Sequence, residues 1–188
     1  MQTHTYKGYT ITIESDDDPL NPYPEWDHFG TFYHWHRRGF AFGEDYSRNL
    51  AGIRDLYNET IAGGGVAIPV WLYEHSGQTI RAGTHNPFTC PWDSGQVGFW
   101  IATKQEIDAE FGGDIGKATE AIKGEVNTMD DYLTGNCWGY TITKGDDLID
   151  SCWGFIGDDK YCLNEAKSVV DHEEKRSLPL LAHAGLIA

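Results

Sequence analysis

Residues 137–155 read CWGYTITKGDDLIDSCWGF, and this stretch decides the fold class. Two runs rich in aromatic and β-branched residues flank Lys144-Gly145-Asp146-Asp147, a turn sequence. This pattern predicts an antiparallel hairpin with strands at 137–143 and 148–155. Both runs carry the order Cys-Trp-Gly-aromatic, so we expect Trp138 and Trp153 to pack across the hairpin.

Patterns typical of strands and helices also occur in other segments of the chain. Alternating or continuous apolar runs predict strands at 6–14, 66–74, 79–82 and 96–103. Apolar residues spaced by three and four predict helices at 47–61, 104–111, 114 to about 133, and 163 to about 176. Clustered strands with helices between the clusters are typical of the α+β class. We therefore expect a single α+β domain, with a largely antiparallel sheet packed against three to four helices.

The arrangement of that sheet is also predicted. One central sheet should contain residues 66–74, 96–103, 137–143 and 148–155. Tryptophans beside glycines suit close backbone packing, so Trp92, Trp138 and Trp153 should be largely buried.

No repeat or linker divides the 188 residues, and we expect one domain spanning residues 1–188. Residues 16–25, DDDPLNPYPE, should form an exposed acidic and proline-rich loop, because proline removes donors and fixes φ. Residues 177–188, SLPLLAHAGLIA, should form an apolar C-terminal extension. The chain shows neither a signal-peptide pattern nor an apolar run long enough to cross a bilayer, which predicts a cytoplasmic protein.

The chain is strongly acidic. It carries 29 Asp and Glu against 14 Lys and Arg, a net charge of −15. This charge argues against direct binding to nucleic acid or to an anionic membrane, and favours a basic partner. The four cysteines form no CxxC pair and are expected to be reduced and structural.

Two groups of residues invite a chemical interpretation. Cys90 and Asp93, with His75, could form the site of a small enzyme or ligand-binding protein around the turn at residues 90–98. Turn chemistry explains the same residues, so we favour a structural turn and a protein without catalytic activity. His34 and His36 would share one face of a strand as a possible metal pair, and His75, His85 or a nearby carboxylate could supply a third ligand, although nothing in the spacing requires one. We expect no metal and no cofactor.

Several blocks resemble one family of small proteins of bacteriophages, plasmids and other mobile elements. They are Trp26-Asp27 with Gly30-Thr31, LYEHSG at 72–77, Pro87-Phe88, CPWDSGQVGF at 90–99, YLTG at 132–135, Gly139-Tyr140 and DSCWGF at 150–155. The family has no established activity, so the resemblance implies no catalytic residue. The chain departs from the family pattern at residues 21–25, where prolines and Tyr23 replace a more polar run.

This resemblance and the charge together suggest a non-enzymatic protein that acts as a DNA mimic. Such a protein would inhibit a host defence system, for example CRISPR or restriction, by presenting carboxylates to a basic host protein in the host cytoplasm. The candidate partner-binding residues are adjacent acids on turns and helix surfaces: Asp16, Asp17, Asp18, Asp130, Asp131, Asp146, Asp147, Asp158 and Asp159. The oligomeric state is left open.

Overall fold

The hairpin at 137–155 forms as predicted in a computed structural model that describes residues 1–38, 40 and 42–183. Strands β8 (Cys137–Lys144) and β9 (Asp147–Ile156) pair antiparallel, and Gly145 takes a φ of 62° in the turn between them. The α+β class is confirmed, with two mostly antiparallel sheets and four substantial helices.

The first sheet has the strand order β1-β2-β8-β9. The strand predicted at residues 6–14 is instead a second hairpin, formed by β1 (Gln2–Tyr6) and β2 (Tyr9–Ser15). The chain reverses at Lys7 and Gly8, whose φ angles of 50° and 79° lie in the left-handed region that a tight hairpin turn uses.

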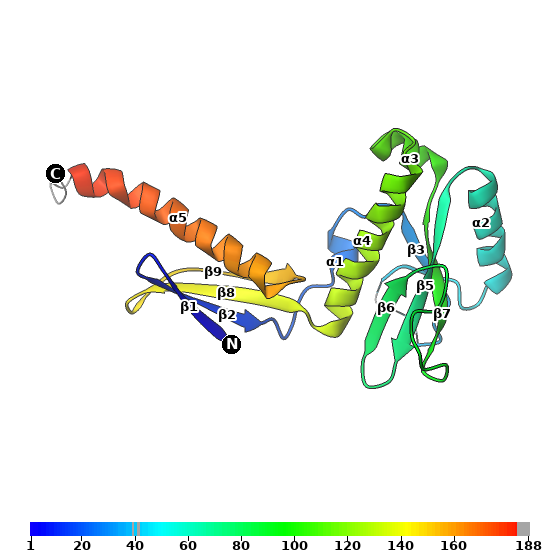
Figure 1. Cartoon of the computed structure of the whole chain (residues 1–188), viewed down its shortest axis with the longest axis horizontal. Coiled ribbons are helices and arrows are strands. Elements are labelled where there is room, and N and C mark those ends of the chain that lie inside the picture. Colours follow the sequence, from blue (N-terminus) through cyan, green and yellow to red (C-terminus); the bar gives the residue numbers. More distant parts are fainter. Residues whose placement is uncertain (39, 41, 184–188) are drawn as a thin grey trace. The chain divides into compact units, whose positions relative to one another are not determined.

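Helix α5 (Asp159–His183) lies over one face of this sheet (Figure 1). Its Cys162, Ala166 and Val170 are buried against Ile11 and Ile142 of the sheet. Period-two alternation along β2 and β8 aims these apolar residues at the helix. The helix is longer than predicted and includes residues 177–183 of the expected extension, while residues 184–188 lie outside the described residues.

The second sheet has the order β4-β3-β7-β5-β6. Its strands are β3 (Thr31–His34), β4 (Glu44–Asp45), β5 (Val66–Glu74), β6 (Gln78–Ala82) and β7 (Ser94–Ala102). Only the short β3–β4 pairing is parallel among the pairings of the described strands. Strand β5 occupies the predicted residues 66–74.

Helices cover both faces of the second sheet. Helix α4 (Ile115–Thr134) buries Ile122, Val126 and Met129 against one face, and α2 (Leu50–Ala62) packs on the other (Figure 1). Helix α3 (Lys104–Phe111) has the predicted bounds and starts at a capping box between Thr103 and Glu106. A short helix α1 (Pro22–Glu25) lies in the predicted loop.

The chain forms two compact units, each with its own core. Unit 1 contains Met1–Leu20 and Gly135–Ala188, and unit 2 contains Asn21–Thr134. The prediction of one central sheet is therefore wrong, because β5 and β7 pair in unit 2 whereas β8 and β9 pair in unit 1. Local sequence patterns identify strands but carry little information about which distant strands pair.

The predicted burial of the tryptophans is wrong at two of three positions. Trp92 is 92% exposed, in the turn before β7, and Trp153 is 49% exposed. The Trp153 ring lies against Gly139 and, among the described residues, is not part of the core that α5 forms with this sheet. Trp138 is partly buried, and its Nε1 donates to the carbonyl of Gly157 at 2.8 Å.

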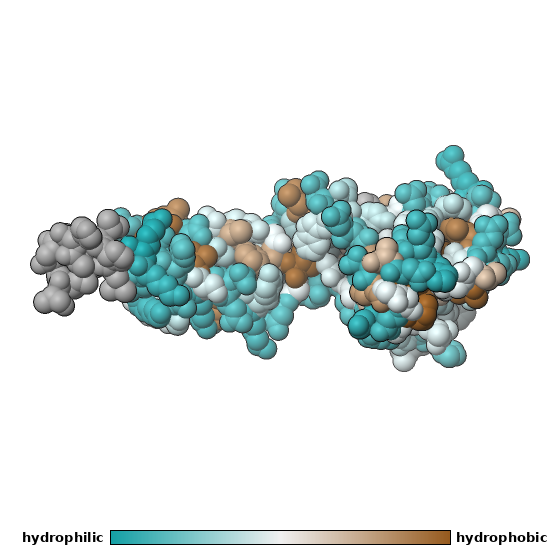
Figure 2. Space-filling model, turned by 90° about the horizontal axis from the view of Figure 1, so that it is seen from above, coloured by the Kyte–Doolittle hydropathy of each residue, from teal (hydrophilic) through white to brown (hydrophobic). Residues whose placement is uncertain are grey.

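No helix in the described part of the chain is both long enough and apolar enough to span a membrane. Hydrophilic residues dominate the face shown in Figure 2, and the hydrophobic patches there are small and separate.

Candidate functional site

Two acidic segments far apart in sequence meet at one end of the first sheet. Asp16 directly follows β2, and its backbone N–H donates to the carbonyl of Cys137 at the start of β8 at 2.8 Å. Cys137 pairs with Ile156 at the end of β9, two residues before Asp158. Antiparallel pairing thus brings residues 16–18 and 158–159 together, and we call Asp16, Asp17, Asp18, Asp158 and Asp159 the acidic end.

Hydrogen bonds within unit 1 hold the side chains of Asp16, Asp158 and Asp159 in place. Asp16 Oδ2 accepts from the backbone N–H of Gly154 at 3.1 Å, and Asp159 Oδ2 accepts from the Gln2 amide at 2.6 Å. Asp17, Asp18 and Asp158 are exposed. The backbone N–H of Lys160 donates to Asp158 and holds the pKa of that carboxyl below its usual range. This hydrogen bond therefore favours the negatively charged form of Asp158.

The other predicted acids lie elsewhere. Asp146 and Asp147 are exposed in the β8–β9 turn, at the opposite end of the same sheet. Asp131 is half-buried near the end of α4 in unit 2. Within unit 1, the predicted acids therefore lie at both ends of the sheet rather than at one.

The prediction that Asp130 is an exposed helix residue is wrong. Asp130 is 6% exposed and accepts hydrogen bonds from the Thr79 hydroxyl at 2.5 Å and the backbone N–H of Ile80 at 2.8 Å. It also pairs with the Arg81 guanidinium. Asp130 follows Val126 by four residues, on the buried stripe of α4, so it fastens this helix to β6.

The alternative site around residues 90–98 is partly assembled. The Cys90 thiol donates to Asp93 Oδ2 at 3.3 Å, and His75 Nδ1 lies 3.4 Å from the same oxygen. Asp93 therefore stands between the thiol and the imidazole, whereas a nucleophilic cysteine needs the imidazole beside it. The arrangement fits a turn fixed by side-chain hydrogen bonds, which include Ser94 Oγ donating to the carbonyl of Cys90 at 2.5 Å.

The cysteines elsewhere are free thiols in different surroundings. Cys137 and Cys162 are buried in unit 1, and Cys152 is exposed. Burial raises the pKa of Cys162 to about 11, which keeps it protonated and unreactive at neutral pH. Burial among core residues gives Cys137 and Cys162 a packing role, but not Cys152.

His34 is the last residue of β3 and His36 follows outside the strand, so the two do not share a strand face as predicted, although both rings pack against Phe40. His34 is buried, and burial lowers its pKa. His36 Nε2 lies 3.2 Å from Glu74, whose pKa is lowered mainly by a hydrogen bond from Gln78. Among residues 1–38, 40 and 42–176, no three His, Cys, Asp or Glu side chains are grouped to hold a metal ion.

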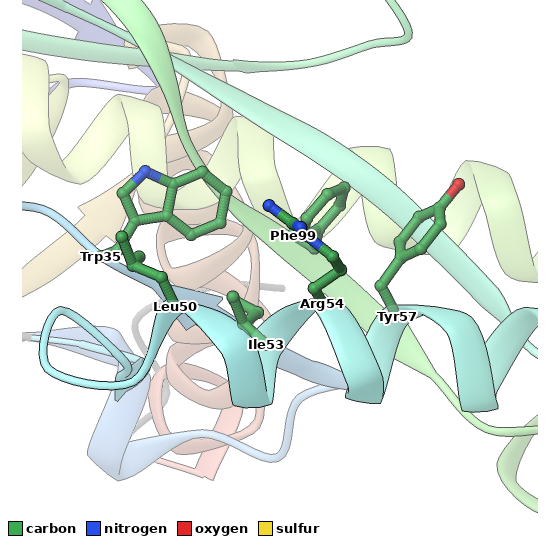
Figure 3. Close-up of a pocket in the computed structure, with 6 residues that line it drawn as sticks. All are labelled: Trp35, Leu50, Ile53, Arg54, Tyr57 and Phe99. Atoms are coloured by element: carbon green, nitrogen blue, oxygen red, sulfur yellow. The ribbon is translucent and has the colours of Figure 1, made fainter.

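Sequence reasoning missed a cavity between α2 and the second sheet. It has a volume of about 360 Å³ and is lined by Trp35, Leu50, Ile53, Arg54, Tyr57 and Phe99 (Figure 3). Helical spacing places Leu50, Ile53 and Tyr57 on the stripe facing the sheet, as the sequence indicates. The missed signal is Arg54, a cation four residues after Leu50, at the edge of this apolar stripe.

Comparisons of the chain with family models, curated proteins and solved structures gave no match.

Proposed function

We propose that this chain is a non-enzymatic acidic protein of a phage or mobile element that binds a basic, nucleic-acid-binding host protein in place of nucleic acid. The observation that carries the proposal is the meeting of residues 16–18 and 158–159 at the acidic end of unit 1. Five carboxylates gather there, and Lys160, 3.8 Å from Asp158, is a cation beside them.

The electrostatic argument is one of complementarity. A groove that binds DNA attracts one negative charge per roughly 1.7 Å of duplex axis. The carboxylates of Asp16 and Asp158 accept backbone hydrogen bonds, so these two can present negative charge to such a groove with little loss of freedom on binding. The net charge of −15 adds long-range attraction to a basic partner and repels nucleic acid itself.

An enzymatic role is less well supported. The residues that would carry it, Cys90, Asp93 and His75, are arranged with the carboxylate in the middle, and His75 is exposed to solvent. This order suits a hydrogen-bonded turn better than an activated nucleophile.

The test uses the full chain as bait for heparin-binding proteins of a bacterial host, followed by titration of the purified captured protein. Binding should weaken at least about tenfold as salt rises from about 50 to 200 mM, and duplex DNA should compete with it. The triple variant D17N/D18N/D158N should weaken binding by a similar factor. Asparagine retains the oxygen acceptor that Lys160 N–H uses, so the fold should be unchanged.

The matched control is D146N/D147N, which removes two exposed carboxylates at the other end of the same sheet. It should leave affinity nearly unchanged. Equal losses in both variants, or binding that salt and DNA do not affect, would show that the acidic end is not the binding surface.

A further inference from the structure

The cavity beneath α2 combines aromatic walls with one cation. Trp35 and Phe99 come from the sheet side, with ring centroids 5.8 Å apart, and the Tyr57 ring lies 4.8 Å from that of Phe99. Ile53 is buried at the floor, and Leu50, 55% exposed, stands at the rim. A volume of about 360 Å³ lies within the range of small-molecule sites.

Arg54 is the charged residue of this lining. It extends from α2 toward Phe99, between Trp35 and Tyr57 (Figure 3). In the part of the chain that the structure describes, no carboxylate forms an ion pair with Arg54. Its guanidinium donors are therefore available to a ligand, and their planar geometry matches a carboxylate.

We propose that this cavity binds a small aromatic monocarboxylate. The aromatic body would pack among Trp35, Tyr57 and Phe99, and the carboxylate would accept hydrogen bonds from Arg54. Aromatic rings prefer offset or edge-on contacts with one another, and the tilted rings of the lining offer both.

The charge of unit 2 restricts the ligand to a single negative charge. Residues 21–134 carry 16 acidic and eight basic residues, a net charge of −8. A nucleotide or another multiply charged anion would meet this repulsion with only one arginine to offset it. A ligand with one carboxylate and a large apolar ring can contact Arg54 and bury its ring, and it meets the least repulsion from the acidic residues.

The test measures binding of 2-naphthoate and of its neutral analogue 2-naphthamide to the full chain by calorimetry. Naphthoate should bind at least about tenfold more tightly than the amide. R54Q should remove this preference and leave affinity for the amide unchanged. R48Q, which neutralises an exposed arginine outside the lining, should keep the preference.

A second variant tests the cavity without changing charge. L50W should fill the rim and weaken both compounds, because Leu50 lines the cavity and its exposure leaves room for a larger side chain. Thermal denaturation would verify that each variant is folded. Equal affinity for the two compounds, loss of preference in R48Q, or failure of naphthoate to bind at millimolar concentration would overturn the proposal. None of these outcomes depends on the acidic end.

Discussion

Asp130 joins α4 to β6 with one side chain. Its carboxylate accepts from a hydroxyl and a backbone N–H and pairs with Arg81. Removing it leaves the buried N–H of Ile80 without its acceptor, which costs more than the hydrogen bond contributed. We expect Asp130→Ala to lower the free energy of unfolding by about 2–4 kcal/mol, measured by urea denaturation.

Asp147→Ala is the control for that measurement, because it removes an exposed carboxylate from a turn. It should change stability by less than about 0.5 kcal/mol. A similar small effect for Asp130→Ala would contradict the role assigned to this buried carboxylate.

His34 should make stability depend on pH. Burial lowers its pKa in the folded state, and the negative charges of Asp45 and Glu44 only partly oppose this effect. Below its unfolded pKa of about 6.5, the unfolded chain binds a proton that the folded chain does not, so the free energy of unfolding falls as pH falls. The loss cannot exceed about 1.4 kcal/mol per pH unit for this one group.

Chemical denaturation between pH about 7.5 and 5.5 would measure this loss. His34→Gln removes the titrating group and should flatten the curve over this window. Carboxylates such as Glu74, whose pKa is lowered, reduce the free energy of unfolding only at lower pH. They therefore do not contribute to the change measured in this pH range. Parallel curves for the two proteins would rule out His34 as the source.

At the scale of elements, the central strand β7 depends on the absence of a side chain at Gly98. A Cβ there would lie 2.4 Å from the carbonyl oxygen of Tyr33 and 2.6 Å from the Phe32 ring. The backbone of β3 cannot move away without disturbing its pairing with β7. We expect Gly98→Ala to cost about 1–3 kcal/mol in thermal or urea denaturation.

Gly95 lies on the same strand and provides a matched comparison. Nothing lies within 4 Å of a Cβ at Gly95, so Gly95→Ala should be neutral within about 0.5 kcal/mol. If both alanine variants unfold alike, close packing at Gly98 is not what limits the strand.

The elements that sequence could predict are those with a strong local signal. Strand β5 is a continuous apolar run, α3 has its capping box, and the β8–β9 turn contains Gly145. Missed elements lacked such a signal: β3 has four residues and β4 has two. The candidate site was predictable to the same degree. Acidic pairs are visible in sequence, but the meeting of residues 16–18 with 158–159 follows from the pairing of β2 with β8.

The burial of Asp130 follows from the helical spacing of apolar residues in α4. It continues the apolar stripe of α4 through Val126, so helical spacing alone places it on the buried face. Residue type alone indicates a surface acid, whereas position in the helix indicates a buried one.

The whole molecule has two cores built from different residues. Phe32, Trp100 and Ile122 belong to the core of unit 2, and Ile11, Ile142 and Val170 to that of unit 1. We expect Val170→Asp, which places a charge in the unit 1 core, to expose β2 and β8 to hydrogen exchange while β5 and β7 of unit 2 keep their protection. Mass spectrometry of peptic peptides would show the difference. Loss of protection in β5 and β7 as well would mean that the two cores unfold as one.

The division of the chain has a consequence for synthesis on the ribosome. Strands β1 and β2 emerge first, but their partner β8 and the helix α5 that covers them follow only after the 114 residues of unit 2, Asn21–Thr134. Synthesis proceeds at about 5–20 residues per second, so Tyr9, Ile11 and Ile13 of the first hairpin stay uncovered for on the order of ten seconds. Unit 2 is complete before that interval ends. A nascent chain arrested soon after Thr134 has left the exit tunnel should therefore carry a folded second sheet and an N-terminal hairpin still open to chaperones.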